Sequence, residues 1–174
     1  MGKIELKNLN NKLQEYLIKK GQTDPNFDAF KYLNPTLSDL NDPFLLQGMK
    51  EATDRINKAL SNHEKIVIYG DYDCDGISAC TILYLFLKSR DADVDVYIPN
   101  RFDDGYGLTE ATIDEIQKTL KPNLIITVDL GITAINETES IKNRGIDIII
   151  TDHHEMGDTP NTAKIVTLKV SDNR

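Results

Sequence analysis

Three aspartates stand within five positions of one another, and their spacing is the feature of this sequence most suggestive of chemistry. Asp71, Asp73 and Asp75 follow an apolar run at residues 66–69 and precede Gly76 and an apolar stretch with helical character. Like charges so close together repel one another unless a cation lies among them. Oxygen ligands of this kind suit Mg²⁺, Ca²⁺ or Mn²⁺. The cluster therefore predicts a divalent metal site just beyond the end of a buried strand.

Two further polar groups follow apolar runs in the same way. Asp129 comes after residues 124–128, and Asp152-His153-His154 comes after residues 146–151. A single aspartate after a strand often only caps a helix, but adjacent histidines are rarer there and histidine is a common metal ligand. Parallel strands present their carboxyl ends at one edge of the sheet, where open α/β folds bind ligands. We therefore expect Asp129 and His153 to converge with Asp73 and Asp75.

The aspartate cluster has three other possible interpretations. An acidic turn with Asp75 as the helix N-cap needs no metal. An EF-hand loop beginning at Asp71 requires a glutamate at its twelfth position, which is Ile82 here, and a preceding helix, so it is excluded. Asp73-Cys-Asp-Gly76 also resembles the nucleophile motif of haloacid-dehalogenase-type phosphatases. That interpretation stays open, although Gly70-Asp-Tyr72 separates the apolar run from the motif.

Composition bounds the remaining possibilities. With 174 residues, 40% hydrophobic and 28% charged, the chain is long enough for one globular domain with a helical prefix. No apolar run reaches membrane-spanning length and no signal-peptide pattern is present, so we expect no membrane partner. The net charge of −8 argues against a broad electrostatic footprint for nucleic acid, although bound divalent ions would offset it locally. Cys74 and Cys80 are expected to be free thiols in a reducing cytoplasm, with Cys74 facing away from any metal.

The surrounding elements predict an α/β fold. We expect a helix over residues 3–20, a looser segment over 23–41, and a helix that starts at Asp42-Pro43 and ends near residue 61. From residue 65 the pattern is that of βαβ units. Strands are predicted at 66–69, 94–98, 123–128, 146–151 and 164–168, and helices at 77–89, 109–120 and 133–143. The expected architecture is a three-layer domain, residues 63–174, with a mostly parallel sheet of about five strands between helices, preceded by a helical lead-in, residues 1–62.

The loop over residues 99–108 contains Arg101, aromatic residues and two glycines. It is either an ordinary strand-to-helix connection, with Thr109 as the N-cap, or a substrate-facing loop. In the second case Arg101 is suited to bidentate binding of a phosphate.

Together these motifs resemble the DHH phosphoesterase superfamily. The resemblance rests on Gly70-Asp-Tyr-Asp-Cys-Asp-Gly76, Ile98-Pro-Asn-Arg-Phe102 with Gly105-Tyr-Gly107, Thr127-Val-Asp-Leu-Gly-Ile132 and Thr151-Asp-His-His154. Within the superfamily the motifs are most similar to the N-terminal catalytic domain of the RecJ family of single-strand-specific 5′→3′ DNA exonucleases. The similarity covers about residues 30 to 165. It implies a nuclease that acts on single-stranded DNA in repair and recombination.

The resemblance also implies roles for individual residues. The implied ligands of two Mn²⁺ or Mg²⁺ ions are Asp73, Asp75, Asp129 and His153, with Asp129 bridging the ions. Asp71 and Asp152 are implied to support the site, and His154 and Arg101 to contact the scissile or a neighbouring phosphate. The implied mechanism is hydrolysis assisted by two ions about 3.5–4 Å apart.

Three departures from the family pattern affect these expectations. Leu130 stands where a small residue is usual, and Thr167-Leu168 stands where Asn-Pro is usual. The chain also stops at Arg174, before the further metal-binding aspartate and the strand-gripping domains of the family. We therefore expect an N-terminal fragment that is weak or inactive alone. Two alternatives remain: a phosphodiesterase of short oligonucleotides or cyclic dinucleotides, and a non-catalytic module that binds metal or a partner.

Overall fold

The structure, a computed structural model, describes residues 3–100, 107–154 and 164–167. For residues 164–167 it describes the backbone alone. It divides into two compact units, Met1–Asp42 and Pro43–Arg174. No helix in the described part of the chain is long and apolar enough to cross a membrane.

The first unit consists of short helical elements. These are a 3₁₀ turn η1 (Leu6–Asn8), helix α1 (Asn11–Thr23), helix α2 (Ala29–Leu33) and a 3₁₀ turn η2 (Leu37–Asp39). A continuous helix over 3–20 is wrong, because the side chain of Asn10 accepts a hydrogen bond from the N–H of Leu13 and caps α1 there. The helix then continues through Gly21, and Leu17 is its buried residue.

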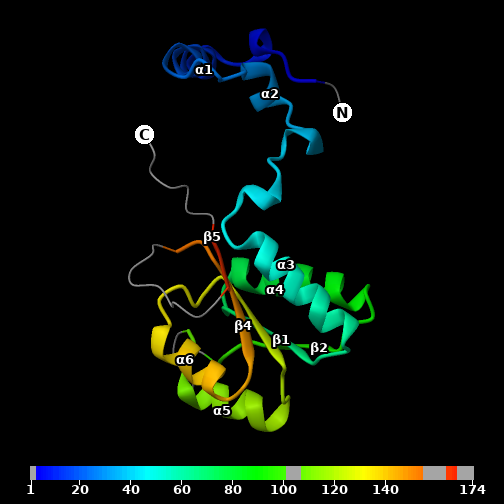
Figure 1. The fold of residues 1–174 in the computed structure, drawn as a ribbon. Helices are drawn as coiled ribbons and strands as arrows, with labels where there is room; N and C mark the ends of the chain where they lie inside the picture. Colours follow the sequence, from blue (N-terminus) through cyan, green and yellow to red (C-terminus); the bar gives the residue numbers. More distant parts are fainter. Residues whose placement is uncertain (1–2, 101–106, 155–163, 168–174) are drawn as a thin grey trace. The chain divides into compact units, whose positions relative to one another are not determined.

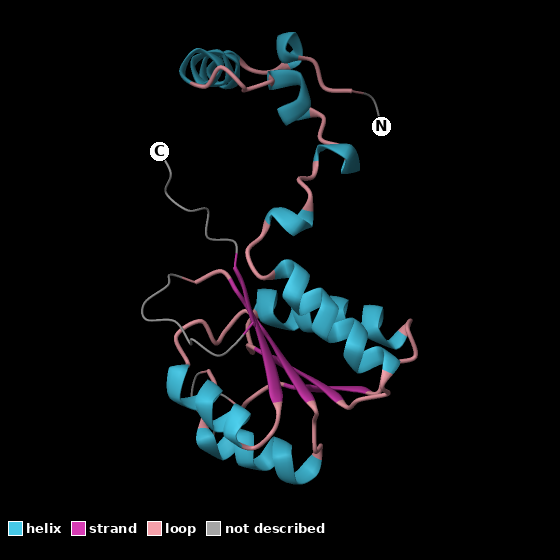
Figure 2. Ribbon diagram, viewed as in Figure 1, coloured by secondary structure: helices cyan, strands magenta, loops and turns pink. Residues whose placement is uncertain are grey.

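The second unit is built on a parallel sheet. Its strands are β1 (Ile66–Gly70), β2 (Val94–Tyr97), β3 (Leu124–Val128), β4 (Asp147–Asp152) and β5 (Lys164–Thr167). Their order is β2-β1-β3-β4-β5, and every pairing is parallel (Figure 2). All residues of β1 and β3 are buried, as expected for strands covered on both faces. The predicted parallel α/β sheet is confirmed.

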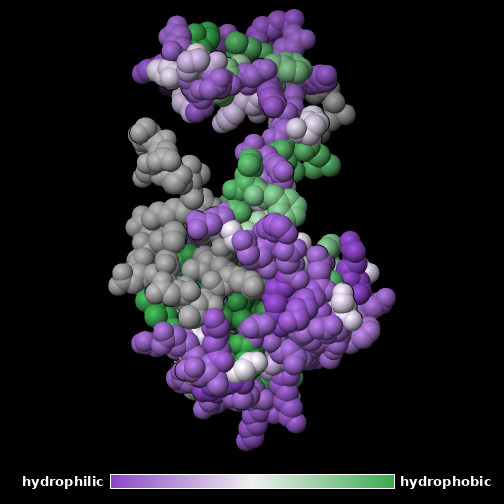
Figure 3. All heavy atoms as spheres, in the orientation of Figure 1, coloured by the Kyte–Doolittle hydropathy of each residue, from purple (hydrophilic) through white to green (hydrophobic). Residues whose placement is uncertain are grey.

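Helices cover both faces of this sheet (Figure 1). Helices α3 (Met49–Ser61) and α4 (Cys74–Lys88) pack on one face, around Ile66, Ile68 and Ile126. Helices α5 (Glu110–Thr119) and α6 (Ile135–Asn143) pack on the other face, around Val67, Ile125 and Ile148. Alternate residues of β1, β3 and β4 thus supply two separate cores. The surface of this unit in view is largely hydrophilic (Figure 3).

Helix α3 begins later than the sequence indicated. The predicted start at Asp42-Pro43 is wrong, because Pro43–Leu45 forms only a 3₁₀ turn η3. Gly48, with φ of 77°, then interrupts the helical conformation before Met49. The helix then buries Ala52 and Ala59 against the sheet. The structural units consequently assign α3 to the α/β unit, whereas the sequence division grouped it with the lead-in.

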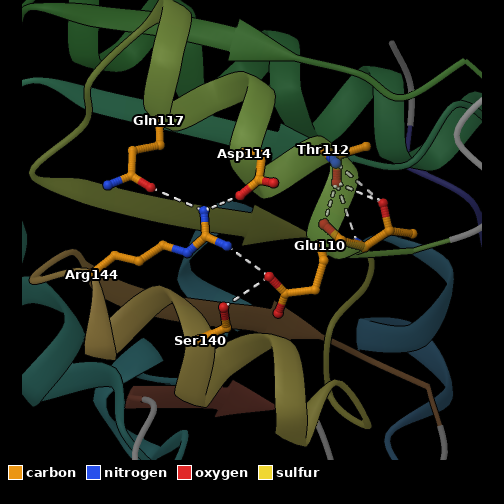
Figure 4. Close-up of polar contacts among 7 residues, drawn as sticks. Glu110, Thr112, Asp114, Gln117, Ser140 and Arg144 are labelled. Carbon is orange, nitrogen blue, oxygen red and sulfur yellow. Dashed lines mark hydrogen bonds and ion pairs between the residues drawn. The ribbon is translucent and has the colours of Figure 1, made fainter.

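Arg144, just beyond the end of α6, fastens α6 to α5 (Figure 4). Its guanidinium donates to Gln117 and forms ion pairs with Glu110 and Asp114 of α5. Ser140 of α6 donates to the same Glu110 carboxylate. These contacts fix the spacing of the two helices.

Candidate functional site

The three aspartates of the first motif form the turn from β1 into α4. Helix α4 begins at Cys74, and the carboxylate of Asp73 caps it by accepting from the N–H of Gly76 at 3.0 Å. The alternative interpretation without a metal placed the cap at Asp75, which instead lies in the first turn of α4 and is exposed. Asp71 is buried and accepts from the N–H of Tyr72 at 2.7 Å. The turn therefore holds one buried and two exposed carboxylates.

Two glycines allow α4 to approach β1 this closely. A Cβ on Gly76 would lie 2.6 Å from the backbone oxygen of Asp71. A Cβ on Gly70 would lie 1.9 Å from Sγ of Cys80, which is buried in α4. Any larger residue at either position would push the helix, and the aspartates it carries, away from the strand.

Asp129 occupies the turn after β3 in a conformation that few side chains adopt. Its φ is 65°, in the left-handed region. Its N–H donates to the backbone oxygen of Thr151 at 2.9 Å, and the hydroxyl of Thr151 donates to the backbone oxygen of Thr127 at 2.6 Å. The hydroxyl of Thr127 in turn donates to the backbone oxygen of Leu130 at 2.8 Å. These bonds hold the strained turn and fix the direction of the Asp129 side chain.

Asp152, at the end of β4, organises the two histidines that follow it. One carboxylate oxygen accepts from the N–H of Ile132 at 2.9 Å. The other contacts His154 twice, at the backbone N–H (3.1 Å) and at Nδ1 (2.7 Å). The Asp152 side chain is nearly inaccessible, whereas His153 and His154 are exposed. A buried carboxylate thus orients an exposed imidazole.

The strand ends bring these side chains together as the sequence predicted. Nε2 of His153 lies 2.8 Å from Oδ1 of Asp129 and 3.7 Å from Oδ2 of Asp75. Two sets of possible ligand atoms lie within 4.8 Å of one another: Asp71, Asp73 and Asp129, and Asp129, His153 and His154. Asp129 belongs to both sets. Of the predicted ligands, Asp73, Asp129 and His153 belong to these sets, together with Asp71 and His154, whereas Asp75 belongs to neither.

The carboxylate of Asp129 is poorly satisfied in its surroundings. Its Oδ1 atom is buried, and no residue in the described part of the chain gives it a hydrogen bond of good geometry, although His153 lies close by. Burial and the neighbouring charges of Asp75 and Asp73 raise the pKa of Asp129, and His153 only partly opposes this. A buried anion without adequate hydrogen bonds is costly. A divalent cation among these oxygen and nitrogen ligands would remove that cost, so the residues fit such an ion.

Asp73, Asp152 and His154 are shifted toward their charged forms. The hydrogen bond from Gly76 and the contact with Asp75 lower the pKa of Asp73. Burial alone would raise the pKa of Asp152, but hydrogen bonds from His154 and Ile132 lower it. The hydrogen bond to Asp152 and the charges of Asp152 and Asp129 raise the pKa of His154, against the effect of its burial. The Asp152–His154 pair therefore favours a carboxylate and an imidazolium.

Two residues named in the sequence analysis are not part of this geometry. Arg101 lies outside the described residues, so its role remains a prediction. Cys74 is exposed and belongs to neither set of possible ligands, and both cysteines are free.

Sequence reasoning missed the residues that support the ligands. Thr127 and Thr151 brace the Asp129 turn, and Gly70 admits Cys80 against β1. Their signal was the repeated placement of a threonine or glycine near the carboxyl end of a strand, one or two positions before an aspartate.

Known proteins share these motifs and this fold. The DHH family, N-terminal domain, matches residues 65–174. The single-stranded-DNA-specific exonuclease RecJ of Bacillus subtilis is 46% identical over 151 residues, covering 86% of this chain and 19% of that protein. RecJ of Thermus thermophilus is 36% identical over 131 residues, 74% of this chain and 19% of that protein. The chain thus spans about a fifth of the length of these relatives.

Solved structures agree with the sequence matches. A crystal structure of exonuclease RecJ bound to manganese superposes with a TM-score of 0.70 at 32% identity, covering 78% of this chain and 34% of the other. RecJ of Thermus thermophilus in complex with Mn²⁺ gives a TM-score of 0.61 at 32% identity, with 77% and 18% coverage. Because the family match covers the whole sheet and all three predicted ligand motifs, this chain belongs to the DHH family, through its N-terminal domain.

Proposed function

We propose that this chain carries the metal-dependent phosphodiesterase centre of a RecJ-like nuclease. The observation that carries the proposal is the position of Asp129, which is shared by two sets of possible metal ligands at one edge of the sheet. One carboxylate between two ligand sets is the arrangement needed to hold a pair of ions. The site residues inferred from the sequence, Asp73, Asp75, Asp129 and His153, are kept as ligands in this proposal.

The proposed ions are Mn²⁺ or Mg²⁺, in keeping with RecJ structures that contain manganese. When bound, such ions supply charge neutralisation at the phosphate and a water of lowered pKa. Aspartate and histidine ligands together suit Mn²⁺, and carboxylates alone suit Mg²⁺. The poorly satisfied Oδ1 atom of Asp129 supports an ion at this position.

The protein's own groups would position the substrate. Asp152 holds Nδ1 of His154 at 2.7 Å, which leaves Nε2 of the same ring directed to other partners. Asp152 raises the pKa of His154, which extends to higher pH the range over which both ring nitrogens carry protons. Nε2–H of His154 can then donate to a non-bridging phosphate oxygen as negative charge develops there. Asp71, buried behind the cluster, would support the ligands from the β1 side.

The proposed substrate is single-stranded DNA, as in the exonucleases that the chain resembles. A role in DNA repair and recombination and a cytoplasmic location belong to the same proposal, and the two free thiols fit that compartment. With a net charge of −8, attraction of the DNA would depend on ions at the strand ends and on a few placed cations.

The chemistry can be tested apart from the handling of a DNA strand. Bis(4-nitrophenyl) phosphate is a small diester that needs no extended groove, so the chain should hydrolyse it slowly in the presence of Mn²⁺. Asp129→Asn keeps the shape and the left-handed backbone of the residue but removes its charge, and it should abolish the Mn²⁺-dependent rate. Hydrolysis that persists unchanged in Asp129→Asn, or that needs no metal, would refute the proposal.

A further inference from the structure

A hollow of about 340 Å³ adjoins the candidate metal centre. It lies between Gly107-Leu108, the segment 130–134 and Glu137, and it is bordered by Asp152 and His154. The segment 130–134 leads from β3 into α6, so the hollow lies at the N-terminal end of α6 beside the strand ends (Figure 1). Because His154 belongs to both the hollow and the ligand set, a molecule that occupies the metal centre would reach directly into this space.

The floor of the hollow is apolar. Leu108, Leu130 and Ile132 line it and are each less than a tenth exposed. Small residues, Gly131 and Ala134, leave the space open beside them. A floor of this kind does not attract a phosphate or a hydrated ion, but it suits the face of a planar or weakly polar group.

Two polar groups at the rim lack partners among the described residues. Glu137 is half-buried, and its carboxylate makes no hydrogen bond or ion pair with the described residues. The backbone N–H of Thr133 likewise has no acceptor among the described residues, whereas the neighbouring N–H of Ile132 donates to Asp152. The helix dipole accounts for an acidic residue in the first turn of α6. It does not account for an open space with an apolar floor in front of that residue.

We propose that this hollow binds the nucleoside part of the nucleotide whose phosphate occupies the metal centre. The base would lie on Leu108, Leu130 and Ile132, and Glu137 would accept from a base N–H or a sugar hydroxyl. This inference rests on the proposed function, because the metal centre supplies the phosphate end of the same ligand. The volume is near the lower end of the roughly 300–1,000 Å³ typical of small-molecule sites, so it suits one nucleoside.

Binding of thymidine 5′-monophosphate and of inorganic phosphate, each with Mg²⁺, tests the inference on the 174-residue chain. We expect the nucleotide to bind at least tenfold more tightly than phosphate. Methyl NMR should show shifts of Leu108, Leu130 and Ile132 with the nucleotide that phosphate does not cause. Leu17, buried in the first unit, should stay unshifted with either probe.

Two substitutions locate the effect. Ala134→Leu should fill the hollow and remove the tenfold advantage of the nucleotide while phosphate binds as before. If Ala134→Leu lowers the melting temperature, Thr133→Leu is used to fill the hollow instead, because Thr133 lines the hollow at an exposed position. Glu137→Gln should weaken nucleotide binding severalfold, whereas Glu139→Gln, an exposed position of α6 outside the hollow, should not.

The outcomes separate this inference from the proposed function. If phosphate and the nucleotide bind with equal affinity and the methyl groups of the floor do not shift, the nucleoside site is refuted. The proposed metal centre is not affected by that result. Nucleotide-induced shifts of those methyl groups without any Mg²⁺ or phosphate binding would support the hollow and count against the metal centre. Nucleotide binding that survives both leucine substitutions would also overturn the inference.

Discussion

The backbone carbonyl of Asp71 lies so near Gly76 that a Cβ on the glycine would come within 2.6 Å of its oxygen. This contact sets the distance between β1 and the start of α4, and with it the positions of Asp73 and Asp75. The obstructing atom belongs to the backbone, so it cannot rotate away as a side chain would.

Gly76→Ala should therefore both destabilise the protein and weaken Mn²⁺ binding. Forced overpacking of this kind costs about 1–3 kcal/mol, which chemical denaturation would measure. Gly21→Ala is the matched control, because its Cβ would make only an ordinary contact at 3.7 Å with Phe27 and it lies within α1. An alanine in a helix interior should stabilise by roughly 0.5–1 kcal/mol. Normal Mn²⁺ affinity in Gly76→Ala would show that the β1–α4 spacing does not control the ligands.

Mn²⁺ should raise the melting temperature of the chain, because a ligand that binds only the folded state stabilises it. At a free concentration 100 times the dissociation constant the gain is about 2.7 kcal/mol. Asp129→Asn should remove most of this shift. Asp91→Asn is the control, since Asp91 also has a left-handed φ, of 57°, but lies exposed beyond the end of α4. An equal Mn²⁺ response in Asp129→Asn and the unsubstituted chain would contradict a shared-ligand role for Asp129.

The two cysteines should differ sharply in reactivity. Burial, with a smaller contribution from the charge of Asp129, raises the pKa of Cys80 to about 11, whereas Cys74 is exposed. N-ethylmaleimide at pH 7.5 should modify Cys74 quickly and Cys80 only as the protein opens, and mass spectrometry would follow both sites. Cys74→Ser should remove the fast phase. Rapid double labelling of the folded chain would contradict the packing of Cys80 against Gly70.

The same shift fixes how Cys80 affects stability at alkaline pH. The folded-state pKa lies above the value of about 8.5 for a free thiol, so the unfolded chain loses this proton first. The contribution of Cys80 to stability is thus complete below about pH 8.5 and is lost as pH rises toward 11. Cys80→Ala should flatten this part of the pH–stability curve, and Cys74→Ala should leave it unchanged.

The position of α3 predicts which truncated chain folds. Residues 43–174 retain α3, whose Ala52 and Ala59 belong to the core, whereas residues 63–174 expose that face of the sheet. The shorter chain also loses Arg55, which is buried and pairs with Glu64 and Asp147. Circular dichroism should show cooperative unfolding for residues 43–174 and none for residues 63–174. A cooperative transition in the shorter chain would instead favour the boundary after residue 62 suggested by the sequence.

The sequence predicted the sheet well because each central strand is rich in β-branched residues, as at Leu124–Val128. It also predicted the meeting of Asp129 and His153, because parallel strands end at one edge. It could not choose between Asp73 and Asp75 as the cap of α4, since both are good caps and the choice depends on contacts around Gly76. These are tertiary effects without a local signature.

Two other features were also beyond the reach of local patterns. The left-handed turn at Asp129 is stabilised by Thr151, which is distant in sequence. The late start of α3 depends on the positive φ of Gly48, which the sequence does not reveal. In both cases the contact or conformation that decides the local structure exists only in the folded chain. The residue types alone therefore do not predict the left-handed turn or the late helix start.

The 174-residue chain should bind Mn²⁺ and yet show little processive digestion of single-stranded DNA. Neither the hollow nor the two ligand sets contains a lysine or arginine among the described residues, and the net charge is −8. A polyanionic strand therefore gains little electrostatic attraction near the site. Since positioning of the substrate can account for about 7–11 kcal/mol of a reaction barrier, weak retention of the strand should slow cleavage severely. The assay is a 5′-phosphorylated oligonucleotide with Mn²⁺, run beside Asp73→Ala. Rapid laddering by the unsubstituted chain that Asp73→Ala abolishes would show that these residues alone hold the strand well enough for catalysis.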